Sequence, residues 1–294
     1  MSQEHRPEKV GAAEAASGFS SGAGGANQTS GRERAQDRAT NKNQKSPVMM
    51  IHGGFCGPWA WDPFAARFRA AGYEVATPAL RFHDGLKPAP ALATVSLTDY
   101  AADLEKQIAA LTAPPVLVGH SMGGLLVQML AARCEIAAAI LLAPTAPWGV
   151  PPSTLFEIGT AQSLMLHVGF WAAILEPNFE VAAAHSLDRF PEQQRAQIFE
   201  KFRPESGRAT FEALHWGLDM RRASEVDIRK VTCPLLFLTG SGDRISPPGT
   251  VERTAALYKN RAHYEVMPGM SHWLIGEPGW ETVCDRSLTW LDSL

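Results

Sequence analysis

Residues 116–124 of the chain are Val-Leu-Val-Gly-His-Ser-Met-Gly-Gly, and this stretch decides the fold. It begins with an apolar run that suits a buried strand, and residues 125–132 after it predict a helix. Between them lies Gly-x-Ser-x-Gly, the pattern of a nucleophile elbow, in which the turn is so tight that the serine backbone is strained. Gly119 and Gly123 leave room for such a turn because they carry no Cβ.

The elbow gives Ser121 and Met122 their expected roles. A serine at this turn presents its hydroxyl beyond the end of the sheet, and the next amide lies at the N-terminus of a helix. We therefore expect Ser121 to be a catalytic nucleophile and the Met122 amide to stabilise a developing oxyanion. The alternative is a glycine-rich turn with a solvated serine, since the pattern alone is permissive.

Composition limits the classes of function. The chain has 294 residues, a hydrophobic fraction of 45% and a net charge of -3, which fits one α/β domain with an insertion. It has no basic stripe after the N-terminal segment and no apolar run long enough to span a bilayer, so we expect neither nucleic acid nor a membrane span. The four cysteines are scattered without a C-x-x-C pair, which favours reduced thiols and a cytoplasmic location over disulfides or zinc.

The chain divides into a leader, a split core and an insert. Residues 1–46 lack aromatic and β-branched residues almost entirely and are predicted to be disordered. Strand and helix patterns alternate over residues 47–146 and 224–294, which predicts a mostly parallel sheet of about six strands flanked by helices. Residues 147–223 carry only helical patterns, from 155–175 to 209–221, and predict an inserted helical cap.

The strands and helices of the predicted core have boundaries set by Pro and Gly. The strands are expected near residues 48–52, 73–77, 116–118, 137–143, 234–239 and 263–267. Helices are expected at residues 62–71, 97–111, 125–132 and 248–258 and from 279 onward, with Thr98 as the N-cap of the second.

Two further side chains complete a catalytic set with Ser121. Asp243 follows one predicted strand and His272 follows the next, so both fall at the carboxyl edge of a parallel sheet, where ligands bind. A serine needs a base to accept its proton, and the base needs an orienting acid. The order Ser121, Asp243, His272 is the one typical of α/β-hydrolases. The second oxyanion donor is expected in the turn after His52, at the Gly54 amide, with Phe55 as the next choice.

The substrate is expected to be largely apolar with one carbonyl group, because the cap is rich in aromatic residues. We expect Phe55, His120, Trp148 and Trp273 to contact it. The sequence leaves open whether His83, in the loop after the second strand, also lines the pocket. No metal-ligand cluster is seen and no cofactor is expected.

From Val48 to Leu294 the sequence resembles the α/β-hydrolase superfamily. The resemblance is carried by His52-Gly53-Gly54, Gly119 to Gly124, Gly242-Asp243 and Ser271-His272. The segment 52–61, with a tryptophan pair after the oxyanion turn, looks like the branch of methylesterases and hydroxynitrile lyases. Lyases of that branch have lysine directly after the catalytic histidine, whereas this chain has Trp273, so the resemblance implies hydrolysis.

The resemblance and the residues together imply a serine carboxylesterase that acts on a small to medium ester through an acyl-enzyme. Two other functions stay open. One is hydrolysis of a carbon–carbon bond in a diketone by the same three residues, and the other is a non-catalytic ligand receptor of this fold. The sequence does not indicate an oligomeric state.

Overall fold

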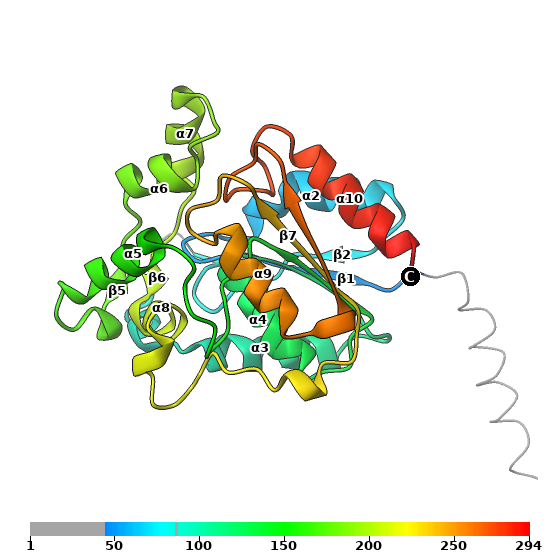
Figure 1. The fold of residues 1–294 in the computed structure, drawn as a ribbon, viewed down its shortest axis with the longest axis horizontal. Helices are drawn as coiled ribbons and strands as arrows, with labels where there is room; N and C mark the ends of the chain where they lie inside the picture. Colours follow the sequence, from blue (N-terminus) through cyan, green and yellow to red (C-terminus); the bar gives the residue numbers. More distant parts are fainter. Residues whose placement is uncertain (1–44, 86–87) are drawn as a thin grey trace, which may run out of the picture. The chain divides into compact units, whose positions relative to one another are not determined.

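The computed structural model describes residues 45–85 and 88–294 (Figure 1). The predicted disordered leader, residues 1–46, lies outside the described part except for its last two residues. No helix of the described residues is long and apolar enough to cross a membrane.

The centre of the molecule is a sheet that, within the described residues, has six strands, all parallel, in the order β2-β1-β3-β4-β7-β8. The predicted α/β class and number of strands are therefore confirmed. The second strand is shorter than predicted, with two residues. The strands are β1 (Val48–Ile51), β2 (Val75–Ala76), β3 (Val116–His120), β4 (Ala138–Leu142), β7 (Leu235–Gly240) and β8 (Ala262–Met267).

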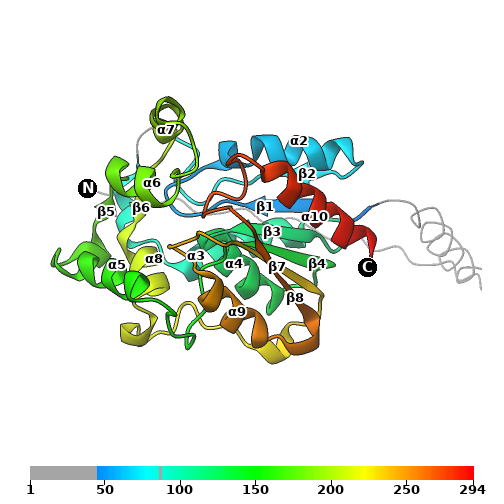
Figure 2. The ribbon, with the colours of Figure 1, turned by 45° about the horizontal axis from the view of Figure 1, so that its top comes forward.

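Helices cover both faces of the sheet (Figure 2). Successive side chains of a strand point to opposite faces, so each central strand contributes side chains to two apolar clusters, one on each face of the sheet. Leu117 and Phe237 pack with α3, α4 and α9 on one face, while Val118 and Leu238 pack with α2 and α10 on the other. These helices are α2 (Asp62–Ala70), α3 (Leu97–Ala109), α4 (Met122–Ala131), α9 (Pro248–Ala256) and α10 (Trp280–Asp292).

The N-cap predicted for α3 is wrong by two residues. Ser96, not Thr98, has extended backbone and accepts a hydrogen bond from the Thr98 amide, and the Asp99 carboxylate accepts from the Ser96 amide. The result is a capping box, which satisfies two amides at the start of the helix.

Residues 147–223, which we call the cap, lie at one end of the sheet in both views (Figures 1 and 2). The cap is not built from helices alone, because β5 and β6 pair antiparallel. The helix predicted over residues 155–175 ends at Met165, and Gly169 follows with a left-handed φ of 83°. The cap elements are α5 (Leu155–Met165), β5 (Ile174–Leu175), α6 (Phe179–His185), α7 (Glu192–Phe199), β6 (Glu205–Ser206) and α8 (Gly207–Leu214).

Candidate active site

Ser121 occupies the sharp turn between β3 and α4. Its φ of 53° and ψ of -121° are strained for a residue with a side chain. The surrounding backbone holds this conformation, since the Ser121 amide donates to Leu142 O at 3.1 Å and its carbonyl accepts from the Thr145 amide at 3.0 Å. A Cβ on Gly123 would lie 2.1 Å from Ile51 O, so only glycine fits where the turn meets β1.

Asp243 and His272 meet beyond the ends of β7 and β8. The Asp243 Oδ2 lies 2.9 Å from His272 Nδ1, and both side chains are buried. The other carboxylate oxygen accepts from the amides of Ile245 at 2.8 Å and Ser246 at 2.9 Å. Because Asp243 accepts a hydrogen bond from Nδ1–H, Nε2 of His272 is left as the basic atom of the ring.

His120 ties the His272 loop to the elbow. Its Nε2 lies 2.8 Å from the His272 carbonyl oxygen, and the two rings lie with centroids 4.9 Å apart. Burial, reinforced by nearby His272, lowers the pKa of His120 to about 3, so this ring is neutral and donates to the carbonyl. The described residues show no hydrogen bond between Ser121 Oγ and His272; such contacts often tighten only when substrate binds.

The turn after β1 lies directly against the elbow. A Cβ on Gly53 would lie 3.0 Å from Ser121 Cβ, and one on Gly54 would lie 3.9 Å from Met122 Cε. The Phe55 amide is already used, since it donates to Glu205 Oε2 at 3.3 Å. Among the hydrogen bonds of the described residues, none uses the amides of Gly54 or Met122. These two amides are therefore available as a pair of donors beside Ser121.

His52, which precedes this turn, is a structural residue. Its Nε2 accepts from the Leu80 amide at 3.1 Å and its Nδ1 lies 2.9 Å from Gly53 O. Burial, followed by the neighbouring His83, lowers the pKa of His52 to about 4. A neutral ring with one donor and one acceptor satisfies both contacts.

The residues expected to contact substrate have distinct surroundings. Phe55 is partly exposed and has a left-handed φ of 61°. Trp273 is buried between Trp59 and the cap residue Phe202, with ring centroids 5.8 and 5.5 Å away. Trp148 packs edge-on against Trp216, and a guanidinium group lies over its ring. For these three residues and for His120, contact with substrate stays a prediction.

A cavity of about 160 Å³ borders two parts of the candidate site. Its lining includes Thr145, whose amide donates to Ser121 O, and Ile245, whose amide donates to Asp243. Most of the remaining lining is apolar, with cap residues such as Phe156 and Trp216. None of Ser121, Asp243 and His272 lines this cavity, but its position next to their hydrogen-bond partners and its apolar lining suit an apolar part of a substrate.

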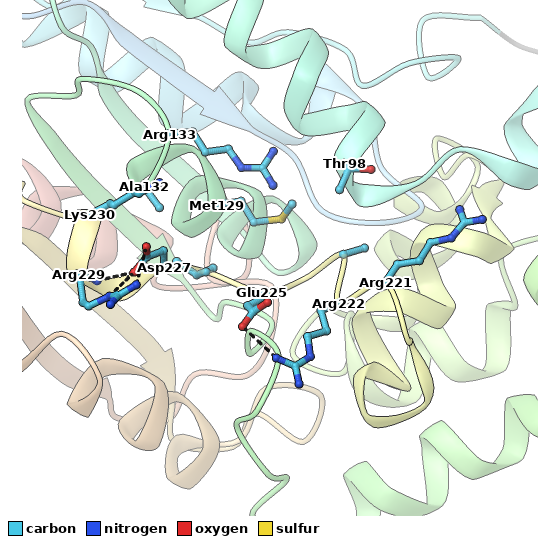
Figure 3. Close-up of a pocket in the computed structure, with 12 residues that line it drawn as sticks. Thr98, Met129, Ala132, Arg133, Arg221, Arg222, Glu225, Asp227, Arg229 and Lys230 are labelled. Carbon is cyan, nitrogen blue, oxygen red and sulfur yellow. Dashed lines mark hydrogen bonds and ion pairs between the residues drawn. The ribbon is translucent and has the colours of Figure 1, made fainter.

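A larger cavity of about 560 Å³ lies elsewhere, between the end of α4 and residues 221–230, which include the end of the cap and the segment after it (Figure 3). It is lined mainly by charged groups, several of them already paired: Arg229 with Asp227 at 3.0 Å and Arg222 with Glu225 at 3.5 Å. None of the candidate catalytic residues lines it. The described residues contain no group of three or more side chains suited to a metal ion.

Sequence reasoning missed a buried polar cluster beside the oxyanion turn. Glu205 joins His83 and Tyr100 there, although residues 204–207 signalled only a break between cap helices. His83 is itself buried. Charged residues are almost never fully buried without a partner, but a sequence does not tell which glutamate will be buried.

The fold and the site together define the class of protein. The model of the α/β-hydrolase family matches residues 48–284, and the chain belongs to that family. No curated protein matches the chain.

Solved structures with the same fold include several esterases and lipases. The methylesterase MES16 from Arabidopsis is similar with a TM-score of 0.66 and 16% identity, over 85% of this chain and 100% of that chain. A monoacylglycerol lipase from Paleococcus ferrophilus has a TM-score of 0.62 and 21% identity, over 84% and 96%. An esterase from Thermogutta terrifontis has a TM-score of 0.62 and 22% identity, over 85% and 90%. At these identities the likeness shows the fold.

Proposed function

We propose that this chain is a serine carboxylesterase. The observation that carries the proposal is the hydrogen bond between Asp243 and His272 beside a strained Ser121. Strain of this kind persists only where the surrounding structure enforces it, and it gathers at functional sites.

In the proposed mechanism Nε2 of His272 accepts the proton of Ser121, whose Oγ attacks the ester carbonyl carbon. Asp243 keeps the proton of the ring on Nδ1 and stabilises the imidazolium. The amides of Gly54 and Met122 donate to the oxyanion of the tetrahedral intermediate. His272 then protonates the departing alcohol. In the second half of the reaction His272 accepts a proton from water, which attacks the acyl-enzyme, and then returns the proton to Ser121 Oγ as the acid leaves.

The small apolar cavity supports esters with a short apolar group. Its volume of about 160 Å³ and its lining by Phe156 and Trp216 suit a compact substituent better than a long chain. Similarity of fold to a methylesterase and to other esterases and lipases agrees with ester hydrolysis in general.

The proposal is tested with Ser121→Ala. We expect the native chain to hydrolyse p-nitrophenyl butyrate faster than the palmitate ester, and Ser121→Ala to lose at least about 10³-fold in kcat. A fluorophosphonate probe should label the native chain and not the variant. Ser293→Ala, which changes an exposed serine near the C-terminus, is the control and should keep full activity.

Other outcomes identify the alternatives. Full turnover by Ser121→Ala contradicts the proposal. Labelling of Ser121 with cleavage of diketones but not of esters indicates carbon–carbon hydrolysis. A native chain that neither labels nor turns over contradicts the proposal and favours the non-catalytic ligand receptor.

A further inference from the structure

Glu205 is a cap carboxylate buried beside the oxyanion turn, with its side chain 1% exposed. Its Oε1 accepts from Tyr100 Oη and from the Ser206 amide, both at 2.7 Å. Its Oε2 accepts from the Phe55 amide at 3.3 Å and lies 3.2 Å from His83 Nε2. Four partners thus surround one buried charge, and three of them (Phe55, His83 and Tyr100) are distant from Glu205 in the sequence. Such partners are the condition for burying a charge at all.

His83 supplies the opposite charge. Its Nδ1 lies 3.1 Å from Arg81 O and its Nε2 faces the Glu205 carboxylate, so both ring nitrogens face acceptors. Only the imidazolium form carries protons on both nitrogens. Burial is the largest single influence on His83 and lowers its pKa, but the contact with Glu205 and the bond to Arg81 O together raise it. At Glu205 burial is again the largest influence, and the contacts with His83, Tyr100 and the Ser206 amide together outweigh it and lower the pKa. The contact is an ion pair without the alignment of a good hydrogen bond.

The pair acts on the backbone that carries the oxyanion donor. Phe55 has a left-handed φ of 61°, which side chains disfavour, and its amide is fixed by Glu205. That hydrogen bond sets the plane of the peptide that joins Gly54 to Phe55. A Cβ on Gly54 would lie 3.6 Å from Glu205 Oε2, so the carboxylate is also close to the place where an oxyanion would form.

We infer that Glu205, neutralised by His83, is a positioning residue that holds the oxyanion turn and couples it to the cap. The inference rests on the proposed function, because the turn has this task only in an acyl-transfer reaction. An unpaired carboxylate at this place would repel the oxyanion, and His83 removes that repulsion. Glu205 itself touches neither the nucleophile nor the base in the described structure.

The other titratable groups around the pair do not replace its charge. His52 lies with its ring centroid 5.4 Å from that of His83, and its lowered pKa keeps it neutral. Burial raises the pKa values of Tyr100 and Cys56, so both stay protonated at neutral pH. Asp84, next to His83 in the chain, is exposed to solvent. Above the raised pKa of His83, Glu205 loses its counter-charge, and kcat is expected to fall on the alkaline side.

Glu205→Gln tests the inference at nearly constant volume. If the amide oxygen keeps the bonds to Tyr100 and Ser206, the amide NH₂ faces the Phe55 N–H, and two donors cannot bond. We expect kcat for p-nitrophenyl butyrate to fall about 10- to 100-fold while KM changes less than about threefold. Binding of a trifluoromethyl ketone, which forms the oxyanion on Ser121, should weaken in parallel.

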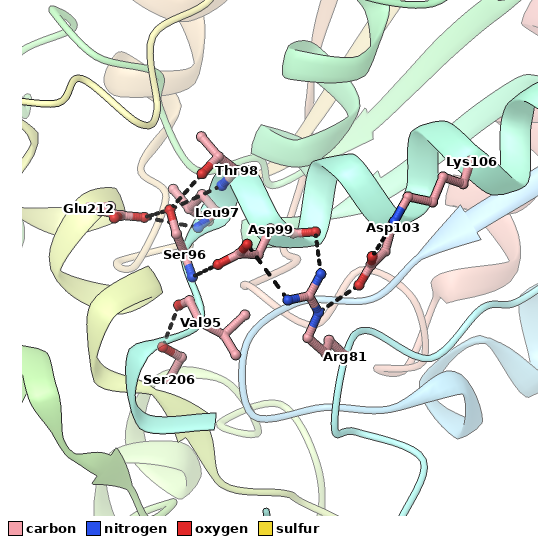
Figure 4. A network of polar contacts seen from close by, with 10 residues as sticks. All are labelled: Arg81, Val95, Ser96, Leu97, Thr98, Asp99, Asp103, Lys106, Ser206 and Glu212. Carbon is pink, nitrogen blue, oxygen red and sulfur yellow. Dashed lines mark hydrogen bonds and ion pairs between the residues drawn. The ribbon is translucent and has the colours of Figure 1, made fainter. Parts of the chain in front are cut away.

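Glu212→Gln is the matched control. Glu212 is a second buried cap carboxylate, on α8, that accepts from Ser96 Oγ at 2.7 Å and from the Leu97 amide at 2.9 Å (Figure 4). It joins the cap to α3 without touching the oxyanion turn. Its variant should keep kcat within about twofold of the native value even if its melting temperature falls.

His83→Asn is the second variant, and it keeps the test decisive if Glu205→Gln does not fold. It removes the titrating charge, so the alkaline fall in kcat should disappear while kcat at neutral pH drops at least about fivefold. Two outcomes overturn the inference when the native chain is active. One is a folded Glu205→Gln with unchanged kcat and inhibitor binding, and the other is a His83→Asn with an unchanged pH profile. A native chain that is inactive and unlabelled overturns the proposed function instead.

Discussion

Glu277 makes the stability of this protein depend on pH in an unusual direction. Its side chain is fully buried, Oε1 accepts from the Ser271 amide at 2.7 Å, and no group of the described residues forms a hydrogen bond with Oε2. Burial, opposed in part by that hydrogen bond, raises the pKa of Glu277 from 4.5 to about 7. Ser271 precedes His272, so the buried carboxyl lies directly beneath the loop of the candidate base.

The sign follows from proton binding. A carboxyl group with a raised pKa binds its proton more tightly in the folded chain than in the unfolded chain. Its contribution therefore favours the folded state at acidic pH and is lost as pH rises from 4.5 to about 7. A shift of this size corresponds to about 3 kcal/mol in total. Part of it is already lost at pH 5, because the unfolded carboxyl ionises from 4.5 upward, and about 2 kcal/mol remains to be lost between pH 5 and pH 8.

Glu277→Gln removes the titration and keeps an oxygen for the Ser271 amide. The quantity to compare is the free energy of unfolding of the variant minus that of the native chain. We expect this difference to be about 2 kcal/mol larger at pH 8 than at pH 5. Urea denaturation followed by circular dichroism at both pH values measures this difference. Other titrating groups are common to both chains and cancel to first order.

Glu281→Gln is the control for this measurement. Glu281 is a carboxylate one turn further along, exposed on α10, and its replacement should change the same difference by less than about 0.5 kcal/mol. If Glu277→Gln gives a difference as small as the control, Glu277 is not protonated in the way its burial implies and the reasoning is refuted.

Two further predictions concern the elbow and the orienting acid. Gly123→Ala places a Cβ 2.1 Å from Ile51 O and should abolish esterase activity and lower the free energy of unfolding by about 1 to 3 kcal/mol or more. The control is Gly159→Ala on α5, where a Cβ would meet no atom of the described residues within 4 Å, and it should be neutral or stabilising in thermal melts. A fully active Gly123→Ala would show that the elbow relaxes easily. Asp243→Asn should lower kcat about 10³- to 10⁴-fold without unfolding the chain. The Ile245 and Ser246 amides hold the amide oxygen of the asparagine, so its NH₂ group faces Nδ1 of His272 and forces the proton of the ring onto Nε2. Stopped-assay rates close to native would exclude Asp243 as the orienting acid.

The sequence alone determined the parts of this protein that depend on local chemistry. Apolar runs separated by Pro and Gly predicted the parallel sheet, and Gly-x-Ser-x-Gly predicted the strained turn at Ser121. Asp243 and His272 could be chosen because parallel strands bring their carboxyl ends to one edge, wherever those strands lie in the chain. Errors arose even at short range: a hydroxyl two residues from the predicted one caps α3, because Asp99 completes a capping box with Ser96.

Only the tertiary structure decided which polar groups are buried and with what partners. Glu205 and His83 lie far apart in the sequence, and neither residue type by itself predicts full burial. A buried charge is stable only when an opposite charge and several donors converge on it, and that convergence exists only after the cap, the loop after β2 and α3 have packed together. Periodicity and local motifs determine the backbone preferences that a sequence can reveal. The charge pairing of a buried site depends on which groups the tertiary fold brings together, and a sequence alone does not specify this.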